Sequence, residues 1–146
     1  MPISQTASRE LVSALLDAAA NLEARLTNSL SNIKGISYGE YRLLSSLAEQ
    51  PAGTASRVDL ARVVGLTPSG VTRALKPLER LGFVETMRND RDARQALASL
   101  TEQGQALVVD AIAVANDTIA TLMDHTPVTP AEGEIVTRFC RDLSWK

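Results

Sequence analysis

The stretch TPSGVTRALKPLERLGFV, residues 67–84, contains the signals that decide the fold. Thr67 can cap a helix because its hydroxyl accepts a backbone N–H of the first turn. Pro68 suits the first helical position, where its missing N–H needs no partner and its fixed φ already fits a helix. Gly82 can adopt the left-handed conformation that commonly ends a helix. These signals predict one short helix with defined ends.

The predicted helix has two different faces. Apolar side chains recur at helical spacing on one face, at Val71, Leu75 and Leu78. Small, hydroxyl-bearing and cationic side chains occupy the other, at Ser69, Gly70, Thr72, Arg73 and Lys76. No acidic residue precedes Glu79 within the helix. Such a face can approach a phosphate backbone and place donors in a major groove. An ordinary amphipathic surface helix has a similar composition, so the flanking sequence has to distinguish the two interpretations.

A shorter helix is predicted directly before this one. Ser56 and Asp59 suit an N-terminal cap, and Gly65 suits the end of a helix. The residues between them include Val58, Leu60, Ala61 and Val64. Only about two residues then separate this helix from the one that Thr67 caps, and two helices joined by such a tight turn form a helix-turn-helix. In that motif the second helix enters the major groove of DNA.

The residues after Gly82 predict a β-hairpin. Residues 83–88 alternate as a strand does, and residues 89–94 are polar and turn-forming. Residues 95–100 would be the return strand, although their Ala-Leu-Ala-Ser core has poor strand propensity. We expect a strand there because a hairpin after a helix-turn-helix completes a winged helix.

Two helices are predicted ahead of the helix-turn-helix. Residues 5–33 lack Gly and Pro and carry an apolar stripe. Its members are Leu11, Leu15, Ala18 and Leu22, then Arg25 or Leu26, and Ser29 or Leu30. Ser37 and Glu40 form a capping box that opens a helix to about residue 50. The buried positions of that second helix are expected to be Tyr41, Leu44, and Leu47 or Ala48.

Two more helices are predicted after the hairpin. Thr101 caps one that runs to about residue 124, with a heptad-like stripe of Val108, Ile112, Ala115, Ile119 and Leu122. Thr129, Pro130 and Glu132 open the other, which carries Ile135, Val136, Phe139 and Leu143 and ends near residue 145. The first helix and this later pair offer more apolar surface than one small lobe covers. Packing against a second subunit is favoured, with burial in the monomer's own core as the alternative.

Four motifs occur in a fixed order along the middle of the chain. They are L-T-x-x-x-V-T-R at 66–73, L-x-x-x-G-x-V at 78–84, D-x-R at Asp92 and Arg94, and L-T-x-x-G at 100–104. Their order and spacing resemble the MarR family of bacterial regulators, strongly over residues 37–107. The resemblance implies a mainly α, winged helix-turn-helix fold with about six helices and a two-stranded wing. It also implies an N-terminal dimerisation helix at 1–36, a DNA-binding lobe at 37–101 and C-terminal dimerisation helices at 102–146.

The resemblance assigns roles to individual residues. The second helix of the motif would meet the major groove through Ser69, Gly70, Thr72, Arg73 and Lys76. Arg94 would be the wing arginine that enters the minor groove, whose potential is most negative where A·T pairs narrow it. Asp92 could orient Arg94 through a bidentate pair. Taken alone, this pair would be an ordinary solvated turn pair that contributes little.

Three residues depart from the family pattern. Ala93 stands where a second basic residue is common, so the wing would hold phosphate less strongly. Pro77 lies inside the predicted recognition helix, where it removes one backbone hydrogen bond and favours a bend. Cys140, the single cysteine, lies in the last helix and not near the N-terminus, where peroxide-sensing relatives carry theirs.

Charge and composition agree with a DNA-binding centre between other segments. The chain has 146 residues and a net charge of −2, yet residues 57–94 contain eight basic and five acidic residues, a local charge of +3. The remainder carries −5. One cysteine suits a reducing cytoplasm, the first residues do not read as a signal peptide, and no apolar run is long enough for a bilayer, so no membrane association is expected.

Residues for catalysis or metal binding are scarce. One histidine, His125, and one cysteine, Cys140, cannot supply a metal cluster, so neither an enzyme nor a cofactor is expected. The resemblance implies a small-molecule pocket near the second helix, for which Tyr38, Tyr41 and Arg42 are candidates, with Arg42 able to pair the carboxylate of an aromatic acid. In the alternative interpretation, Tyr41 belongs to the core and Arg42 is a surface charge.

The function predicted from these patterns is a dimeric DNA-binding regulator of transcription. We expect a repressor that a small ligand releases from a pseudo-palindromic operator. Two alternatives stay open at this point. One is a winged-helix module that binds protein and not DNA, and the other is a redox-sensing regulator based on Cys140.

Overall fold

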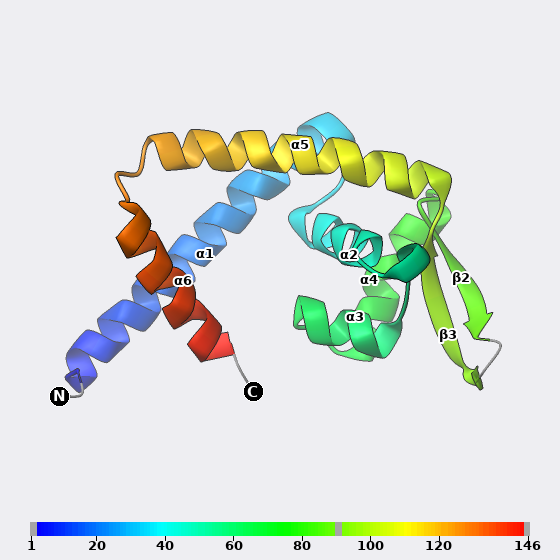
Figure 1. Cartoon of the computed structure of the whole chain (residues 1–146), viewed down its shortest axis with the longest axis horizontal. Helices are drawn as coiled ribbons and strands as arrows, with labels where there is room; N and C mark the ends of the chain where they lie inside the picture. Colours follow the sequence, from blue (N-terminus) through cyan, green and yellow to red (C-terminus); the bar gives the residue numbers. More distant parts are fainter. Residues whose placement is uncertain (1–2, 90–91, 145–146) are drawn as a thin grey trace.

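The chain folds into a winged lobe with long helices that leave it on one side. The computed structural model describes residues 3–89 and 92–144, including all their side chains except those of 88, 89 and 92–95. In Figure 1, α5 runs from the lobe to the opposite end, where α6 and the start of α1 lie. The elements are α1 (Gln5–Lys34), α2 (Tyr38–Ala48), η1 (Pro51–Gly53), β1 (Thr54–Ser56), α3 (Arg57–Val64), α4 (Pro68–Arg80), β2 (Val84–Asn89), β3 (Asp92–Leu100), α5 (Glu102–Asp124) and α6 (Pro130–Ser144).

Side-chain caps fix where the helices begin. Glu40 donates its backbone N–H to the Ser37 hydroxyl, and its carboxylate accepts the N–H of Ser37, which completes the predicted capping box. Thr129 and Glu132 form a similar pair at α6, and the hydrogen bonds from Thr129 lower the pKa of the Glu132 carboxyl. Single hydroxyl caps open α3, α4 and α5 at Ser56, Thr67 and Thr101. Each satisfies an amide that has no partner within its own helix, and the predicted helix starts are confirmed.

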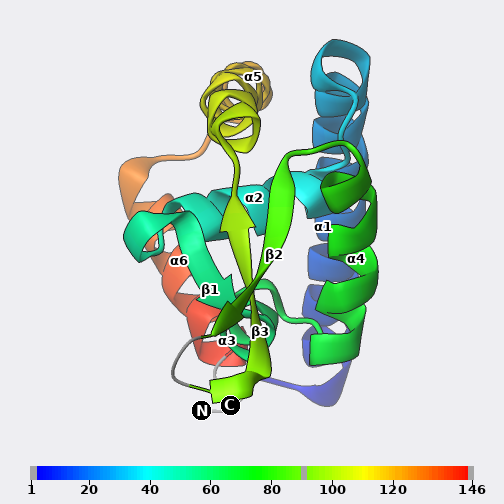
Figure 2. The ribbon, with the colours of Figure 1, turned by 90° about the vertical axis from the view of Figure 1, so that its right-hand side faces the viewer.

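The sheet has three strands, whereas the sequence predicted a two-stranded wing. β3 pairs antiparallel with both β1 and β2, so the strand order is β1-β3-β2 (Figure 2). Thr54 lies opposite Ser99, and its hydroxyl donates to the Ser99 hydroxyl at 2.9 Å. The sequence does not reveal β1, because three residues are too few to show the alternation of a strand.

The Ala-rich return strand is confirmed as β3, and its small residues have a packing reason. Ala98 is fully buried, and Ser99 is nearly so. β3 is the middle strand and contacts α2, α3 and α5. Small side chains allow these helices to approach the sheet closely, and this packing outweighs the poor strand propensity of alanine.

The core of the lobe forms where α2 and α4 meet. The predicted inner face of α4 is confirmed, since Val71, Leu75 and Leu78 are fully buried. On α2 the prediction is wrong in part: Leu43 is buried together with Leu44 and Leu47, Tyr41 is half-buried, and Ala48 is exposed. α2 contacts α1, α3, α4 and α5, so more than one stripe of its surface is covered.

The first turn of α5 is joined to the lobe by a tight junction. Thr101 donates its backbone N–H to the carbonyl of Phe83 at 3.1 Å and its hydroxyl to the carbonyl of Gly82 at 2.6 Å. Gly104 lies so close to this turn that a Cβ atom there would be 2.0 Å from the Phe83 carbonyl oxygen. Only glycine allows that approach, which explains the glycine of the L-T-x-x-G motif.

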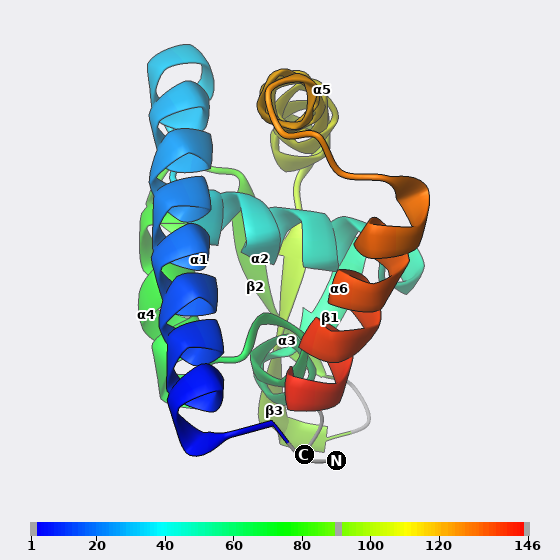
Figure 3. The same cartoon turned by 90° about the vertical axis from the view of Figure 1, so that its left-hand side faces the viewer.

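The long helices leave much of their apolar surface uncovered by the chain itself. α1 buries only Leu26 and Leu30, and α6 has no buried residue within its bounds. The predicted stripe of α5 is divided, with Val108 and Ala115 buried but Ile112 and Ile119 exposed. Figure 3 shows α1 and α6 on different sides of the molecule, with α1 beside α5 and α6 below it. Further exposed apolar side chains on these helices are Leu11, Val12, Leu16, Leu22, Val109, Met123, Ile135, Val136 and Leu143.

α5 is also the one helix in the described residues that is long and apolar enough, by length and composition, to cross a membrane. The prediction from the sequence concerned uninterrupted apolar runs, and in α5 Asp110 and Asp117 interrupt the run. Core helices of water-soluble proteins pass the same test. Since α5 begins in the lobe core and packs along α1, its composition is weak evidence for a membrane span.

Candidate nucleic-acid interface

α3 and α4 form the predicted helix-turn-helix. Gly65 ends α3 in the left-handed conformation, with φ of 71°. The N–H of Leu66 donates to the carbonyl of Ala61 at 3.0 Å, which satisfies a carbonyl at the end of α3. Thr67 then caps α4 through the N–H of Gly70. The turn is therefore confined to residues 65–67, and α4 is in the position of a recognition helix.

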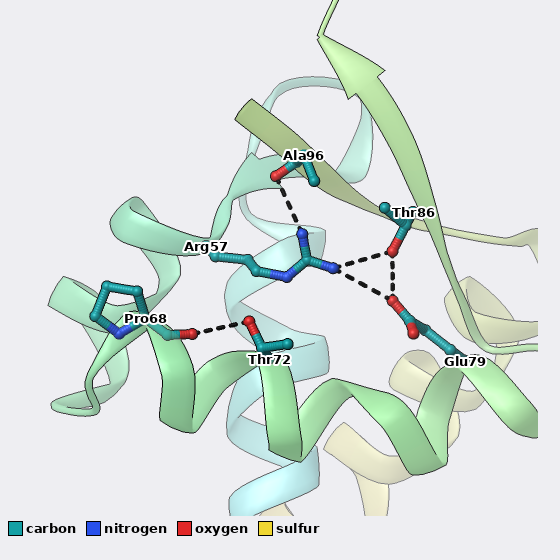
Figure 4. A network of polar contacts seen from close by, with 6 residues as sticks. All are labelled: Arg57, Pro68, Thr72, Glu79, Thr86 and Ala96. Carbon is teal, nitrogen blue, oxygen red and sulfur yellow. Dashed lines mark hydrogen bonds and ion pairs between the residues drawn. The ribbon is translucent and has the colours of Figure 1, made fainter. Parts of the chain in front are cut away.

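The predicted polar face of α4 is exposed as one surface. Ser69, Arg73 and Lys76 are exposed, and Gly70 and Thr72 are partly exposed. The buried apolar side of the same helix fixes this orientation. The Thr72 hydroxyl donates to the carbonyl of Pro68 at 3.0 Å, so it remains available only as an acceptor (Figure 4). The structure brings these five residues together, and their contact with DNA stays a prediction.

Gly70 contributes space and not a chemical group. A Cβ atom at this position would lie 3.2 Å from the Thr67 hydroxyl oxygen, which is the atom that caps α4. A side chain would therefore press on the cap. The same lack of a side chain allows another backbone to approach the start of the helix closely.

α4 continues through Pro77 and ends where the glycine signal predicts. The helix is unbroken from Pro68 to Arg80, although Pro77 cannot donate to the carbonyl of Arg73. Gly82 has φ of 79°, and the N–H of Phe83 donates to the carbonyl of Leu78 at 2.9 Å. This arrangement is a Schellman cap, which reverses the chain into β2.

The wing consists of β2 and β3, with an irregularity in register between Arg88 and Asn89. Asp92 and Arg94, the two residues predicted for the wing contact, belong to β3. Their side chains lie outside the described part of the structure. The predicted pair between them and the insertion of Arg94 into a minor groove therefore stay predictions.

A polar network connects the recognition helix to the wing (Figure 4). Nη2 of Arg57 donates to the Thr86 hydroxyl at 3.1 Å and lies 3.7 Å from Oε1 of Glu79. Nη1 of Arg57 lies 3.5 Å from the carbonyl oxygen of Ala96. The Thr86 hydroxyl donates to the Glu79 carboxylate. The sequence count includes Arg57 in the basic centre, whereas the structure engages its guanidinium within the lobe; that contact could not be predicted, because it depends on how four elements pack.

The residues predicted for a ligand pocket lie beside the core. The rings of Tyr38 and Tyr41 stack, with centroids 6.0 Å apart and planes 29° apart, and both rings are half-buried. Arg42 is exposed, and its Nη2 donates to the carbonyl of Val63 at 3.4 Å. Tyr38 and Tyr41 pack against the hydrophobic core, as the alternative interpretation expected for Tyr41.

A groove of about 820 Å³ lies elsewhere, between α1 and α5. Tyr38, Tyr41 and Arg42 do not line it. Its walls combine one cation, one anion, small polar groups and apolar side chains: Arg25, Asn28, Ser29, Ile33, Ala113, Val114, Asp117, Thr118, Thr121 and Leu122. Sequence analysis did not identify it, because the groove depends on how the two long helices cross.

The single cysteine and the single histidine have ordinary environments. Cys140 is half-buried in α6. His125 follows the last turn of α5, where its Nδ1 lies 2.8 Å from the carbonyl oxygen of Thr121. Within residues 3–89 and 92–144, no group of three or more histidine, cysteine or acidic side chains is arranged to hold a metal ion.

Comparison with known proteins identifies the same architecture. A family model described as "MarR family" matches residues 36–96. The uncharacterized HTH-type transcriptional regulator YwhA of Bacillus subtilis is 40% identical over 53 residues, which are 36% of this chain and 38% of that protein. The transcriptional regulator ZitR of Lactococcus lactis subsp. cremoris is 26% identical over 92% of both chains. The chain spans 38% to 59% of the length of the three relatives that it matches over shorter stretches.

A solved structure extends the similarity to the long helices. A MarR family transcriptional regulator of Streptomyces coelicolor, crystallised in complex with DNA, shares 27% identity and a TM-score of 0.87. The alignment covers 99% of this chain and 90% of that one. The family model covers the helix-turn-helix, and the fold of a MarR family transcriptional regulator is shared along nearly the whole chain, so residues 36–96 match the MarR family and the chain has a winged-helix fold.

Proposed function

We propose that the chain is a dimeric, sequence-specific DNA-binding regulator of transcription that acts in the cytoplasm. One observation carries this proposal, namely the acid-free face of α4, where Ser69, Arg73 and Lys76 are exposed opposite a fully buried apolar face. A helix held in this way presents the same donors to every partner. The match of residues 36–96 to the MarR family model supports DNA as that partner, as does the similar S. coelicolor regulator crystallised with DNA.

The proposed contacts divide between the two grooves. Arg73 and Lys76 extend from the middle of α4 and would reach base edges or phosphates in the major groove. Ser69 would meet phosphate at the start of α4, where the helix dipole favours negative charge, and Gly70, whose N–H is donated to the Thr67 cap, would leave room for the DNA backbone. Thr72 would accept from a base amino group. Arg94, oriented by Asp92, would enter the minor groove.

The proposed dimer uses the helices that bury least within the chain. Residues 1–36 and 102–146 would form the dimerisation regions, and residues 37–101 would form the DNA-binding lobe. The exposed apolar side chains of α1, α5 and α6 support this division, because solvent contact with so much apolar surface is unfavourable. Two lobes related by a two-fold axis would bind a pseudo-palindromic operator and repress transcription.

A small aromatic acid is the proposed effector, with Tyr38, Tyr41 and Arg42 as its contacts. The Arg42 guanidinium is exposed and makes one long hydrogen bond, so a carboxylate could replace that partner. Benzoate is a suitable probe. We expect benzoate to release the wild-type protein from DNA, and Arg42→Gln to be insensitive, whereas neutral benzyl alcohol should release neither. Equal release of Arg42→Gln would exclude Arg42 as the carboxylate partner.

The DNA contacts can be tested on operators selected from a random duplex library. Arg73→Ala should cost about 1–3 kcal/mol and relax the preference at one position of the core, as expected if Arg73 binds guanine through two hydrogen bonds. Arg94→Ala should weaken binding most where the flanks are A·T-rich, because Arg94 would respond to groove width. The measurement is affinity for operators with single core changes and with either A·T or G·C flanks.

Arg138→Ala on α6 is the control, since it removes a cation outside the lobe. Uniform losses on every operator would reduce both arginines to phosphate contacts. A wild-type protein without steep, salt-dependent affinity for any duplex would overturn DNA binding and favour the protein-interaction alternative.

A further inference from the structure

Arg57 lies between the recognition helix and the wing and contacts both. It is the first residue of α3, yet its guanidinium reaches Glu79 on α4, Thr86 on β2 and Ala96 on β3 (Figure 4). We infer that Arg57 is a positioning residue, which sets the orientation of the wing hairpin relative to the recognition helix. This inference rests on the proposed function, in which α4 and the wing bind two grooves of one duplex.

The contacts of Arg57 lie along the middle of the hairpin. Thr86 pairs with Ala98, and Ala96 pairs with Arg88, so the guanidinium meets both wing strands at two rungs of the ladder that are separated by one further rung. Val84, closer to α4, is buried in the core. Glu85 and Met87 are exposed on either side of Thr86, and the hairpin continues from there toward the lower right of Figure 1. Arg57 therefore holds the two strands beyond their base at Val84 and Leu100, so the loss of its contacts would let the outer part of the hairpin change its angle to α4.

The backbone of Arg57 is itself anchored from the opposite edge of the sheet. Ser56, the last residue of β1, pairs with Leu97 on β3, and its hydroxyl caps α3. Arg57 follows directly. β1 and the α3 cap thus fix the backbone position of Arg57, from which its side chain extends to β2 and α4. This arrangement also gives the third strand a role beyond extending the sheet.

The chemistry requires a planar fork and not merely a positive charge. Two separate nitrogens of Arg57 serve different partners, and a lysine ammonium on a flexible stem could not hold both directions. The Arg57 side chain is 20% exposed and Glu79 30%, whereas the nearby Arg62–Asp59 pair is 77% and 57% exposed. Nε of Arg57 is buried without a hydrogen-bond partner among the described residues. Because its guanidinium is engaged by these partners within the lobe, Arg57 is not free to bind DNA as an exposed cation would.

The first experiment uses the free protein, so its result does not depend on DNA binding. Amide residual dipolar couplings report the orientation of α4 and of the hairpin. In the wild-type protein both should fit one alignment tensor. In Arg57→Met the couplings of the hairpin should require a separate alignment tensor of smaller magnitude. Arg57→Lys should show almost the same separation. Arg62→Met, on the exposed face of the same helix, is the matched control and should leave a single tensor.

The second experiment measures binding to operators with A·T or G·C flanks. Arg57→Met should lose roughly tenfold of the preference for A·T flanks, which is within the range for coupled neighbouring residues. The preference at core positions should persist. In a double-mutant cycle with Arg94→Ala the losses should not add, because Arg57 would act through the wing. In Arg57→Met alone, the unpaired Glu79 could repel DNA. Adding Glu79→Gln removes that repulsion, and the double variant should still show the same loss of flank preference.

Several results would overturn the inference. A single alignment tensor in Arg57→Met would do so, whether or not the protein binds DNA. Additive losses with Arg94→Ala would make Arg57 a separate phosphate contact, and recovery in the double variant with Glu79→Gln would leave only charge shielding. If the wild-type protein binds no duplex, the proposed function fails, and the dipolar couplings alone decide the role of Arg57.

Discussion

The winged lobe and the long helices satisfy their apolar residues in opposite ways. Most of the largest fully buried side chains lie in the lobe, from Leu43 on α2 to Leu78 on α4. α6 buries none within its bounds, and α5 exposes Val109 and Met123. The lobe is therefore complete within one chain, whereas the long helices need another surface. This difference supports the two proposed roles, a DNA-binding surface for the lobe and a contact between chains for the long helices.

The largest effect is expected at the junction between the two regions. Gly104→Ala would place a Cβ atom 2.0 Å from the Phe83 carbonyl oxygen, so the backbone has to move. We expect the free energy of unfolding to fall by about 3 kcal/mol, the upper part of the range for overpacking. Gly39→Ala is the control, because the nearest atom to its Cβ would be 3.9 Å away. Urea unfolding of both variants measures the difference, and equal stability would show that the junction tolerates a side chain.

A substitution on the long helices is expected to weaken association strongly, whereas a matched substitution on the lobe should not. Val136 is 52% exposed on α6, and Val136→Glu would place a charge in the proposed dimer interface. The dimer should weaken about a hundredfold, comparable to the loss of an interface hot spot. Leu81→Glu, at a 58% exposed position of the lobe, should leave association unchanged. Ultracentrifugation at micromolar concentration decides the matter, and a stable wild-type monomer would contradict the dimer itself.

The smallest effect is expected at Cys140. It is half-buried in α6, which belongs to the proposed dimer contact and not to the lobe. Cys140→Ser should bind DNA as the wild type does, and peroxide should leave wild-type binding unchanged. If peroxide releases the protein from DNA and Cys140→Ser abolishes that release, the chain is a redox sensor and this interpretation of α6 is incomplete.

Local signals in the sequence predict most of the fold. The caps at Ser37, Ser56, Thr67 and Thr101 are hydrogen bonds between residues three apart in the sequence. The residue types at these positions are therefore enough to predict where the helices begin. The return strand β3 required the order of elements as well, because its alanines do not favour a strand. β1 could be predicted neither from local signals nor from the order of the elements. It is stabilised by pairing with a strand more than forty residues later, as Thr54 opposite Ser99 shows.

The candidate site shows a similar division. The exposed face of α4 could be predicted, because periodicity separates Arg73 from the buried Leu75. The role of Arg57 could not, because a count of charges does not distinguish a cation in solvent from one held by Glu79 and Thr86. The burial of Leu43 could not be predicted either, because the apolar stripe of one helix does not show how many other helices pack against α2.

In the proposed dimer, the junction at Thr101 and Gly104 would let α5 transmit a rotation to the lobe. The 23 residues of α5 span about 35 Å at 1.5 Å per residue. Because its first turn is joined to the end of the recognition helix, a tilt of about 5° at the far end would swing the lobe by roughly 3 Å over that helix length. Two such helices in one dimer would change the separation of their recognition helices by up to twice as much. Half-sites one turn of DNA apart would then be matched or missed according to contacts made far from the duplex.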